Sequence, residues 1–198
     1  MDFRRTRLHS VSGDLAGLPP PERPEIVVVG RSNVGKSSLV NALGDNRTLA
    51  RISSMPGKTR LVIIFDVDGI LFLVDLPGYG YAKVAKDKKK DFSRLVEGYL
   101  HSDRDLRMAI HIVDIRHEPS PEDQLMRGWL LSRGIRTVTV LTKVDKLTRM
   151  QVLERHAAIR AFFTMKEEDT TLVFSAENRT GVDELRGILQ REVLKKNP

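Results

Sequence analysis

The chain has 198 residues, of which 40% are hydrophobic and 30% charged, and its formal net charge at pH 7 is +7. This length suits one domain with a single core, and no apolar run approaches the roughly 20 residues that would cross a bilayer. The absence of cysteine excludes disulfides, thiolate metal ligands and C-terminal prenylation. We expect a monomeric, cytoplasmic protein without membrane attachment.

The positive net charge favours polyanionic partners through phosphate neutralisation, although many basic proteins bind no nucleic acid. The three arginines among the first seven residues are not followed by an apolar stretch, so no secretory signal is predicted. No pair of the five histidines has the spacing of metal ligands, and we expect no dedicated transition-metal site. Composition alone therefore indicates a basic globular domain and leaves its chemistry to the motifs.

Residues 1–23 are expected to form a lead-in segment and residues 24–198 the main domain. Four prolines between residues 19 and 24 exclude a helix and a fully bonded strand there, while an edge strand is predicted around Leu8–Val11. Ile26–Val29 is apolar on both faces, which is typical of a strand buried in a parallel sheet. The main domain therefore begins with a central strand.

A phosphate-binding loop is predicted directly after this strand. Gly30–Ser37 reads GRSNVGKS and matches G-x-x-x-x-G-K-[ST] at every fixed position, just before a predicted helix over Ser37–Leu43. The two glycines let successive backbone N–H groups turn inward around a phosphate chain. Lys36 would reach the outer phosphates and Ser37 would bind Mg²⁺, while the positive end of the helix favours the bound negative charge.

Two strands that flank a tight turn follow. Arg60–Val67 and Ile70–Asp75 surround Asp68-Gly69, a dipeptide that joins antiparallel strands. The stretches Asp45–Thr59 and Leu76–Lys90 lack periodicity and are predicted to be irregular loops. One hairpin inside an otherwise alternating chain predicts a mixed sheet.

The rest of the chain alternates between helical periodicity and short buried runs. The predicted helices lie at Phe92–Leu100, around Leu125–Leu130 with Trp129 as a core residue, at Met150–Phe163 and at Val182–Leu189, and the predicted strands lie at Met108–Val113, Ile135–Leu141 and Thr171–Phe174. This order predicts an α/β three-layer sandwich. Ligands of such sheets lie at the carboxyl ends of the strands, so the segments after Val29, Asp75, Leu141 and Phe174 should converge on one pocket.

A carboxylate and a glycine follow the second strand of the hairpin, in the sequence Asp75-Leu76-Pro77-Gly78. Asp75 can hold Mg²⁺ through a water because magnesium keeps most of its hydration shell, and the Gly78 N–H can meet a terminal phosphate. D-x-x-G is a weak signal by itself. Its position at a strand end after a phosphate loop makes it informative.

A base-recognition motif, Thr142-Lys143-Val144-Asp145, follows a later strand. Guanine offers adjacent N1–H and N2 donors that one carboxylate accepts together, whereas adenine has an acceptor at N1, so Asp145 favours GTP over ATP. Lys143 would lay its stem over the base, and amides within Phe174–Glu177, chiefly that of Ala176, would meet guanine O6. These motifs predict a guanine-nucleotide site.

The motifs GRSNVGKSS, PGKTR, DLPGYGYAK, TKVD and SAE, in this order, resemble those of the EngB/YihA (YsxC) GTPases, bacterial relatives of Era and EngA. The resemblance covers Pro24–Leu194, and PGKTR together with DLPGYGYAK is nearly diagnostic. It implies a P-loop NTPase of the Ras-like G-domain type with a six-stranded mixed, mostly parallel sheet. It also implies GTP and GDP binding, slow GTP hydrolysis, assembly of the large ribosomal subunit through that subunit or its rRNA and precursors, and links with the cell cycle and septation.

The resemblance also implies roles for individual residues. Thr59 matches a threonine that reaches Mg²⁺ and the γ-phosphate, Ser38 a residue that binds the α-phosphate, and Asn33 an asparagine that helps coordinate potassium. Catalytic roles fall to Lys36, Thr59 and Gly78, and Mg²⁺ would be held by Ser37 and Thr59, with Asp75 acting through water. The nucleotide site is expected to comprise Gly30, Arg31, Ser32, Asn33, Val34, Gly35, Lys36, Ser37, Ser38, Pro56, Gly57, Lys58, Thr59, Asp75, Leu76, Pro77, Gly78, Thr142, Lys143, Val144, Asp145, Phe174, Ser175, Ala176 and Glu177.

The sequence departs from the pattern of related GTPases at two positions. Tyr79 stands where Ras-like proteins place the glutamine that orients water, and Thr142 replaces the asparagine of the common N-K-x-D motif. The threonine hydroxyl can still bond the phosphate loop, with one fewer donor. We therefore expect slow intrinsic turnover, with the site completed by the ribosome or by a cation; Asn33 either binds that K⁺ or only braces the loop.

A basic run adjoins the second irregular segment, and its lysines are Lys83, Lys86, Lys88, Lys89 and Lys90. It is interpreted as an RNA contact, with a solvated helix start as the alternative. The leading hypothesis is a GTP-hydrolysing assembly switch. A GDP/GTP-sensing RNA or protein adaptor with negligible hydrolysis is the alternative, and the TKVD motif argues against a P-loop kinase or ATPase.

Overall fold

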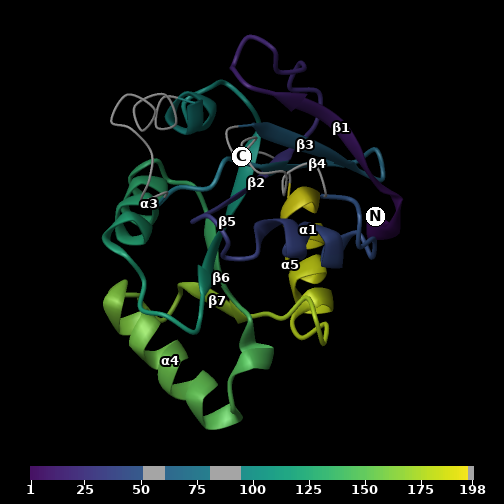
Figure 1. Ribbon diagram of the computed structural model, residues 1–198. Helices are drawn as coiled ribbons and strands as arrows, with labels where there is room; N and C mark the ends of the chain where they lie inside the picture. Colours follow the sequence, from purple (N-terminus) through teal and green to yellow (C-terminus); the bar gives the residue numbers. More distant parts are fainter. Residues whose placement is uncertain (51–60, 81–94, 196–198) are drawn as a thin grey trace.

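The computed structural model describes residues 1–50, 61–80 and 95–195, in which a twisted sheet lies between two layers of helices (Figure 1). The strands are β1 (Thr6–Ser12), β2 (Glu25–Gly30), β3 (Val62–Val67), β4 (Leu71–Asp75), β5 (Leu106–Asp114), β6 (Thr137–Thr142) and β7 (Thr170–Val173). The labelled helices are α1 (Lys36–Leu43), α3 (Pro121–Ser132), α4 (Arg149–Phe162) and α5 (Val182–Leu194). Residues 95–100 are also helical.

The order of strands across the sheet is β1-β3-β4-β2-β5-β6-β7. β4, β2, β5, β6 and β7 run parallel, whereas β3 is antiparallel to both β4 and β1. Asp68 and Gly69 join β3 to β4 with φ values of 56° and 71°, the left-handed conformation that a tight hairpin turn requires. The predicted mixed sheet and its hairpin are confirmed.

The sheet of the described residues has seven strands, one more than the resemblance implied. The additional strand is β1, the N-terminal edge strand expected around Leu8–Val11, which pairs with β3 from Thr6↔Val67 to Ser12↔Val62. Without it, the outer edge of β3 would present unpaired N–H and C=O groups. The division of the chain between residues 23 and 24 stays a prediction.

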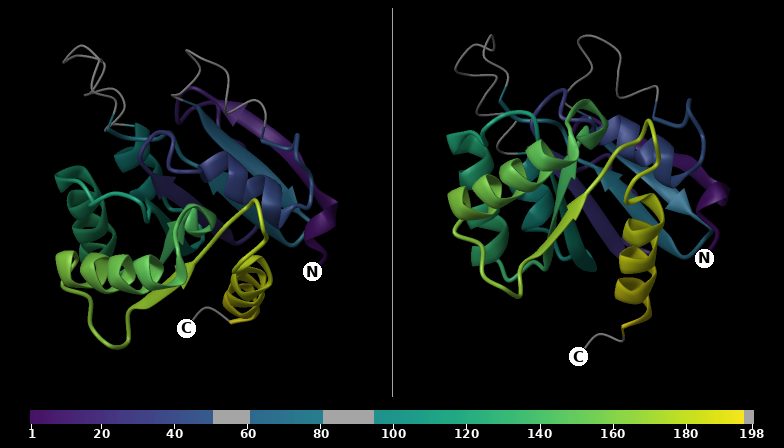
Figure 2. Two further views of the ribbon diagram at one scale, coloured as in Figure 1. Left: turned by 60° about the horizontal axis from the view of Figure 1, so that its bottom comes forward. Right: turned by 90° about the horizontal axis from the view of Figure 1, so that it is seen from below.

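Helices cover both faces of the sheet (Figure 2), and alternate residues of β2 pack against opposite helical layers. Ile26 and Val28 of β2 pack in the same cluster as residues of α1 and α5, whereas Val27 and Val29 pack with the helical residues 95–100 and Leu130 of α3. This two-sided burial explains why the β2 sequence is apolar without alternation. None of the helices in the described ranges combines the length and apolar character needed to span a membrane.

Candidate functional site

The carboxyl ends of the parallel strands lie together at one edge of the sheet. In the strand register, Val28 pairs with Asp75, Asp114 with Thr142, and Leu141 with Val173. The motifs that follow β2, β4, β6 and β7 therefore begin at neighbouring points. The strand ends are neighbours, as the sequence predicted, and a single pocket shared by all four segments stays a prediction.

The loop between β2 and α1 has a conformation that depends on its glycines. Gly35 has a φ of 108° and Asn33 one of 65°, so both lie in the left-handed region that reverses the direction of the chain. At Gly30, a β-carbon would lie 2.8 Å from the Ile112 carbonyl oxygen of β5. Only glycine allows this close approach, which fixes the start of the loop against the sheet.

Lys36 and Asp75 place opposite charges in the buried floor of this loop. The Lys36 ammonium donates long hydrogen bonds to the Gly30 and Arg31 carbonyls, at 3.5 and 3.4 Å, and burial lowers its pKa. Asp75 is 3% exposed, and its Oδ1 has no hydrogen-bond partner among the described residues. Burial raises the pKa of Asp75 to about 6, against the attraction of Lys36.

Replacing Asp75 by asparagine should stabilise the nucleotide-free protein at pH 7. The pKa of Asp75 rises from 3.8 to about 6 on folding, so the folded state holds a costly buried carboxylate once the pH exceeds that range. The shift corresponds to on the order of 2–3 kcal/mol at pH 7 and to less at pH 5. Thermal unfolding of both proteins at the two pH values measures this difference.

Asp66 provides the matched control for that prediction. It is also buried, but Arg7 and Arg23 lie 3.0 and 3.1 Å from its Oδ2, and its pKa is lowered because hydrogen bonds from Gly69 and Arg7 outweigh burial. Asp66→Asn should therefore lower the melting temperature at pH 7. A melting temperature that also falls for Asp75→Asn would contradict the proposed burial cost.

A cavity of about 210 Å³ opens where β6 and β7 end, and it is lined by Gly35, Ser38, Thr142, Lys143, Asp145, Lys146, Phe174, Ala176 and Glu177. The Ser175 hydroxyl donates a 2.6 Å hydrogen bond to Asp145 Oδ1, and Lys146 Nζ lies 3.0 Å from Oδ2. The hydrogen bond from Ser175 lowers the pKa of Asp145. The Asp145 carboxylate is thus ionised and held in a fixed orientation in the lining of the cavity. Such a carboxylate can accept hydrogen bonds from two adjacent donors of a ligand.

The β6 segment is bonded directly to the phosphate loop. Thr142 Oγ1 donates to the Val34 carbonyl at 2.6 Å, which is the hydrogen bond expected of this threonine in place of asparagine. Lys143 has a φ of 65° and its ammonium donates to the Asn33 carbonyl at 2.8 Å. The predicted phosphate and base halves therefore form one connected structure.

The comparisons with known proteins agree with this geometry. A family model described as "50S ribosome-binding GTPase" matches residues 25–143. "Probable GTP-binding protein EngB" of Lachnospira eligens is 38% identical over 98% of this chain and 92% of its own length. The protein of the same name from Syntrophomonas wolfei is 42% identical over 96% and 97%. The chain belongs to the EngB family of GTPases.

Solved structures show the same fold. A crystal structure of a probable EngB protein matches with a TM-score of 0.70 at 22% identity, covering 87% of this chain and all of that one. Era in complex with MgGDPNP and a segment of 16S ribosomal RNA matches with a TM-score of 0.62 at 18% identity, over 88% of this chain and 58% of that one. This chain thus has the fold of the P-loop GTPases, with a mostly parallel sheet.

The structure adds one carboxylate to this EngB site that the motifs did not reveal. Asp114, at the end of β5, receives a two-pronged ion pair from Arg116 and lies 2.8 Å from Lys143 Nζ. Although burial acts to raise its pKa, hydrogen bonds from Arg116 and Lys143 lower it to about 2. Asp114 follows a buried strand as Asp75 does, and that shared position was the available signal.

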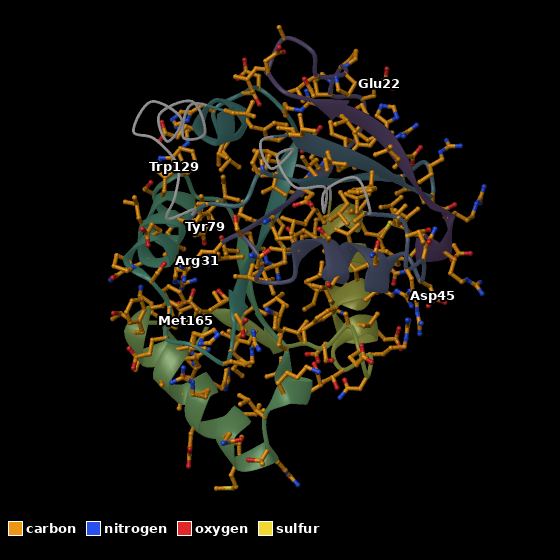
Figure 3. The ribbon with its side chains drawn as sticks, in the orientation of Figure 1. Glu22, Arg31, Asp45, Tyr79, Trp129 and Met165 are labelled. Carbon is orange, nitrogen blue, oxygen red and sulfur yellow. The ribbon has the colours of Figure 1, made fainter. Side chains whose placement is uncertain are left out.

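Tyr79 is not placed to take over the water-orienting role of the missing glutamine. Its side chain is buried, and its hydroxyl lies 2.8 Å from both His111 Nε2 and Asp123 Oδ1, so it is turned into the protein (Figure 3).

Thr59 and the other three residues of the predicted 56–59 segment lie outside the described residues, as do all five lysines of the predicted RNA contact. Their roles stay predictions.

Proposed function

We propose that this EngB-family chain hydrolyses GTP to GDP and phosphate, and that the reaction operates a conformational switch in assembly of the large ribosomal subunit. The observation that supports it best is the bond between Thr142 and the Val34 carbonyl, which joins the phosphate loop to the cavity of Asp145. The family description names ribosome binding, and a net charge of +7 suits an rRNA partner.

The buried carboxylate of Asp75 fits a magnesium site. An orphaned acid oxygen beside the phosphate loop is a natural acceptor for a metal-bound water. Ser37 and Thr59 would hold Mg²⁺ directly, and Asp75 would hold it through that water. When bound, the ion neutralises charge on the β- and γ-phosphate oxygens, to which Lys36 and the Gly78 N–H contribute as fixed donors.

Asp145 would select the base. Because Ser175 and Lys146 orient its ionised carboxylate, it can accept from N1–H and the N2 amino group of guanine together. Adenine would place its N1 acceptor against the Asp145 carboxylate, which has lost its hydrating water to the base. The resulting cost of several kcal/mol is sufficient to exclude ATP.

Slow intrinsic turnover is expected because the tyrosine that replaces glutamine points away from the phosphate loop. Multiple-turnover hydrolysis with and without large ribosomal subunits tests this point, after calorimetry with GDP, GTP and ATP. Activation by the subunit supports the switch. Nucleotide binding without turnover in either condition would instead support the GDP/GTP-sensing adaptor.

Potassium is a further candidate for completing the site, through Asn33, whose backbone is held in the left-handed conformation. Hydrolysis in K⁺ buffer should then be at least several-fold faster than in Na⁺ buffer of equal ionic strength. Equal rates would leave Asn33 as a brace of the loop.

RNA contact through the lysine run makes a separate prediction. Changing Lys86, Lys88, Lys89 and Lys90 to glutamate should weaken binding to the large subunit and flatten its salt dependence, because fewer counterions are released. Co-sedimentation in GDP and in a non-hydrolysable GTP analogue, over a range of salt, measures both effects. Binding that keeps its strength and salt slope would remove these lysines from the interface.

A further inference from the structure

A buried polar cluster behind the phosphate loop is not used by the proposed reaction. Tyr79, His111 and Asp123 are 7%, 0% and 2% exposed. The Tyr79 hydroxyl donates to Asp123 Oδ1 and lies against His111 Nε2, each at 2.8 Å. Since the single hydroxyl hydrogen goes to the carboxylate, His111 is the donor of the other bond, from its Nε2–H.

The partners of Tyr79 are themselves fixed. Asp123 closes the start of α3, where its Oδ2 accepts from the Ser120 amide at 2.8 Å and from the Ser120 hydroxyl at 3.0 Å. His111 lies in the middle of β5. The helix that carries Asp123, α3, is itself held by an ion pair between its Arg127 and Asp169 at 2.8 Å. The tyrosine hydroxyl is therefore bonded to two rigid elements, and movement of its ring would break buried hydrogen bonds to a charged group.

The backbone of the same residue lies on the phosphate loop. The Ser32 amide donates to the Tyr79 carbonyl at 2.9 Å, and the Tyr79 amide donates to the Gly30 carbonyl at 3.3 Å. Gly78 is pressed so closely to the loop that a β-carbon there would lie 2.6 Å from Lys36 Nζ and 3.0 Å from the Ser32 amide nitrogen. The segment that should meet a terminal phosphate is thus in contact with the lysine that should bind the same phosphate.

A γ-phosphate between Lys36 and the Gly78 amide needs oxygen atoms about 2.7–3.2 Å from each donor. Because Gly78 is packed against both the Lys36 ammonium and the Ser32 amide, the phosphate can enter only if the end of Lys36 swings aside or Gly78 withdraws from the loop, and the withdrawal of Gly78 strains the bonds of Tyr79. GDP has no group at this point and makes no such demand. The bonds that hold Tyr79 therefore oppose the triphosphate and not the diphosphate.

We infer that Tyr79 is a specificity-determining residue for the terminal phosphate: its buried bonds to Asp123 and His111 hold Gly78 against Lys36 and thereby favour GDP over GTP. The inference rests on the proposed guanine-nucleotide function. It gives the tyrosine that stands in place of the water-orienting glutamine a role in nucleotide preference. Tyr79 acts through Gly78 and is a positioning residue.

The test compares Tyr79→Phe with the wild-type chain by calorimetry, using GDP and a non-hydrolysable GTP analogue with Mg²⁺. Loss of one hydrogen bond to a buried carboxylate should raise the ratio Kd(GDP)/Kd(analogue) by about 3- to 10-fold, mainly through tighter binding of the analogue. Asp123→Asn weakens the same bond from its acceptor side and should shift the ratio in the same direction.

Tyr99→Phe is the matched control. Tyr99 is 0% exposed, and its hydroxyl donates to Glu25 Oε2 at 2.6 Å, at the opposite end of β2 from the phosphate loop. This variant loses a comparable bond, which thermal unfolding records as a lower melting temperature, but its nucleotide ratio should match the wild type. The inference is overturned if Tyr79→Phe keeps the wild-type ratio, lowers it, or changes it no more than Tyr99→Phe does. A wild-type chain that binds neither nucleotide would overturn the proposed function as well.

Discussion

Asp145→Asn should lower the affinity for GTP and GDP by at least about 100-fold and raise the affinity for xanthine nucleotides. The asparagine amide places a donor where guanine presents the N1–H and N2 donors, and it suits the C2 carbonyl of xanthine. Ser175 would keep the side chain in its present orientation by donating to the remaining amide oxygen, whereas Lys146 would lose its acceptor. Calorimetry with GDP and xanthosine diphosphate measures both halves of the exchange.

Asp183→Asn is the control for this change of base preference from guanine to xanthine. Its carboxylate is 91% exposed at the start of α5 and pairs only with Arg186 among the described residues, so its replacement should leave all affinities unchanged. If Asp145→Asn weakened GDP without any gain for the xanthine nucleotide, the carboxylate would support the structure of the cavity and would not read the base.

Lys36→Met should also weaken GDP and GTP binding by about 100-fold or more. Methionine keeps most of the buried stem but removes the charge that the phosphate loop places to reach the outer phosphates, where hydrogen bonds to charged groups are strong. The loss should be larger for GTP than for GDP, because the terminal phosphate adds charge. Calorimetry with both nucleotides at one Mg²⁺ concentration measures the two losses.

Lys166→Met removes an equal charge from a side chain that is 78% exposed and should not change either affinity. Equal, small losses in the two lysine variants would show that net charge, and not the position of Lys36, governs nucleotide affinity.

Most of the fold could be predicted from the sequence because its local signals agree with one another. The buried β2 run, the Asp68-Gly69 turn and the helical spacing in α4 each predicted the element now found, within two residues at its ends. The rule that ligands bind at the carboxyl ends of parallel strands then predicted that Asp75 and Asp145 lie near the phosphate loop. Regular elements with a strict period are what such reasoning resolves best.

Contacts between side chains that are distant in the sequence were not predictable in the same way. Nothing in the motif DLPGYG shows that Tyr79 bonds Asp123, 44 residues further along the chain. The ion pair between Asp114 and Lys143 likewise joins the ends of two different strands, and Lys143 has a left-handed backbone there. A linear pattern shows which side chains leave a strand end, but the direction in which each points is set by packing.

Thr142 and Lys143 donate hydrogen bonds to the carbonyls of Val34 and Asn33. These bonds should make binding of the base and binding of the phosphates cooperative. A guanine ring on the Lys143 stem would order the phosphate loop, whose amides must enclose the diphosphate. Binding of the base therefore lowers the entropy cost of binding the diphosphate, and the reverse also holds. Guanosine should therefore bind more tightly when pyrophosphate is present than alone. By reciprocity, pyrophosphate should gain the same factor from guanosine.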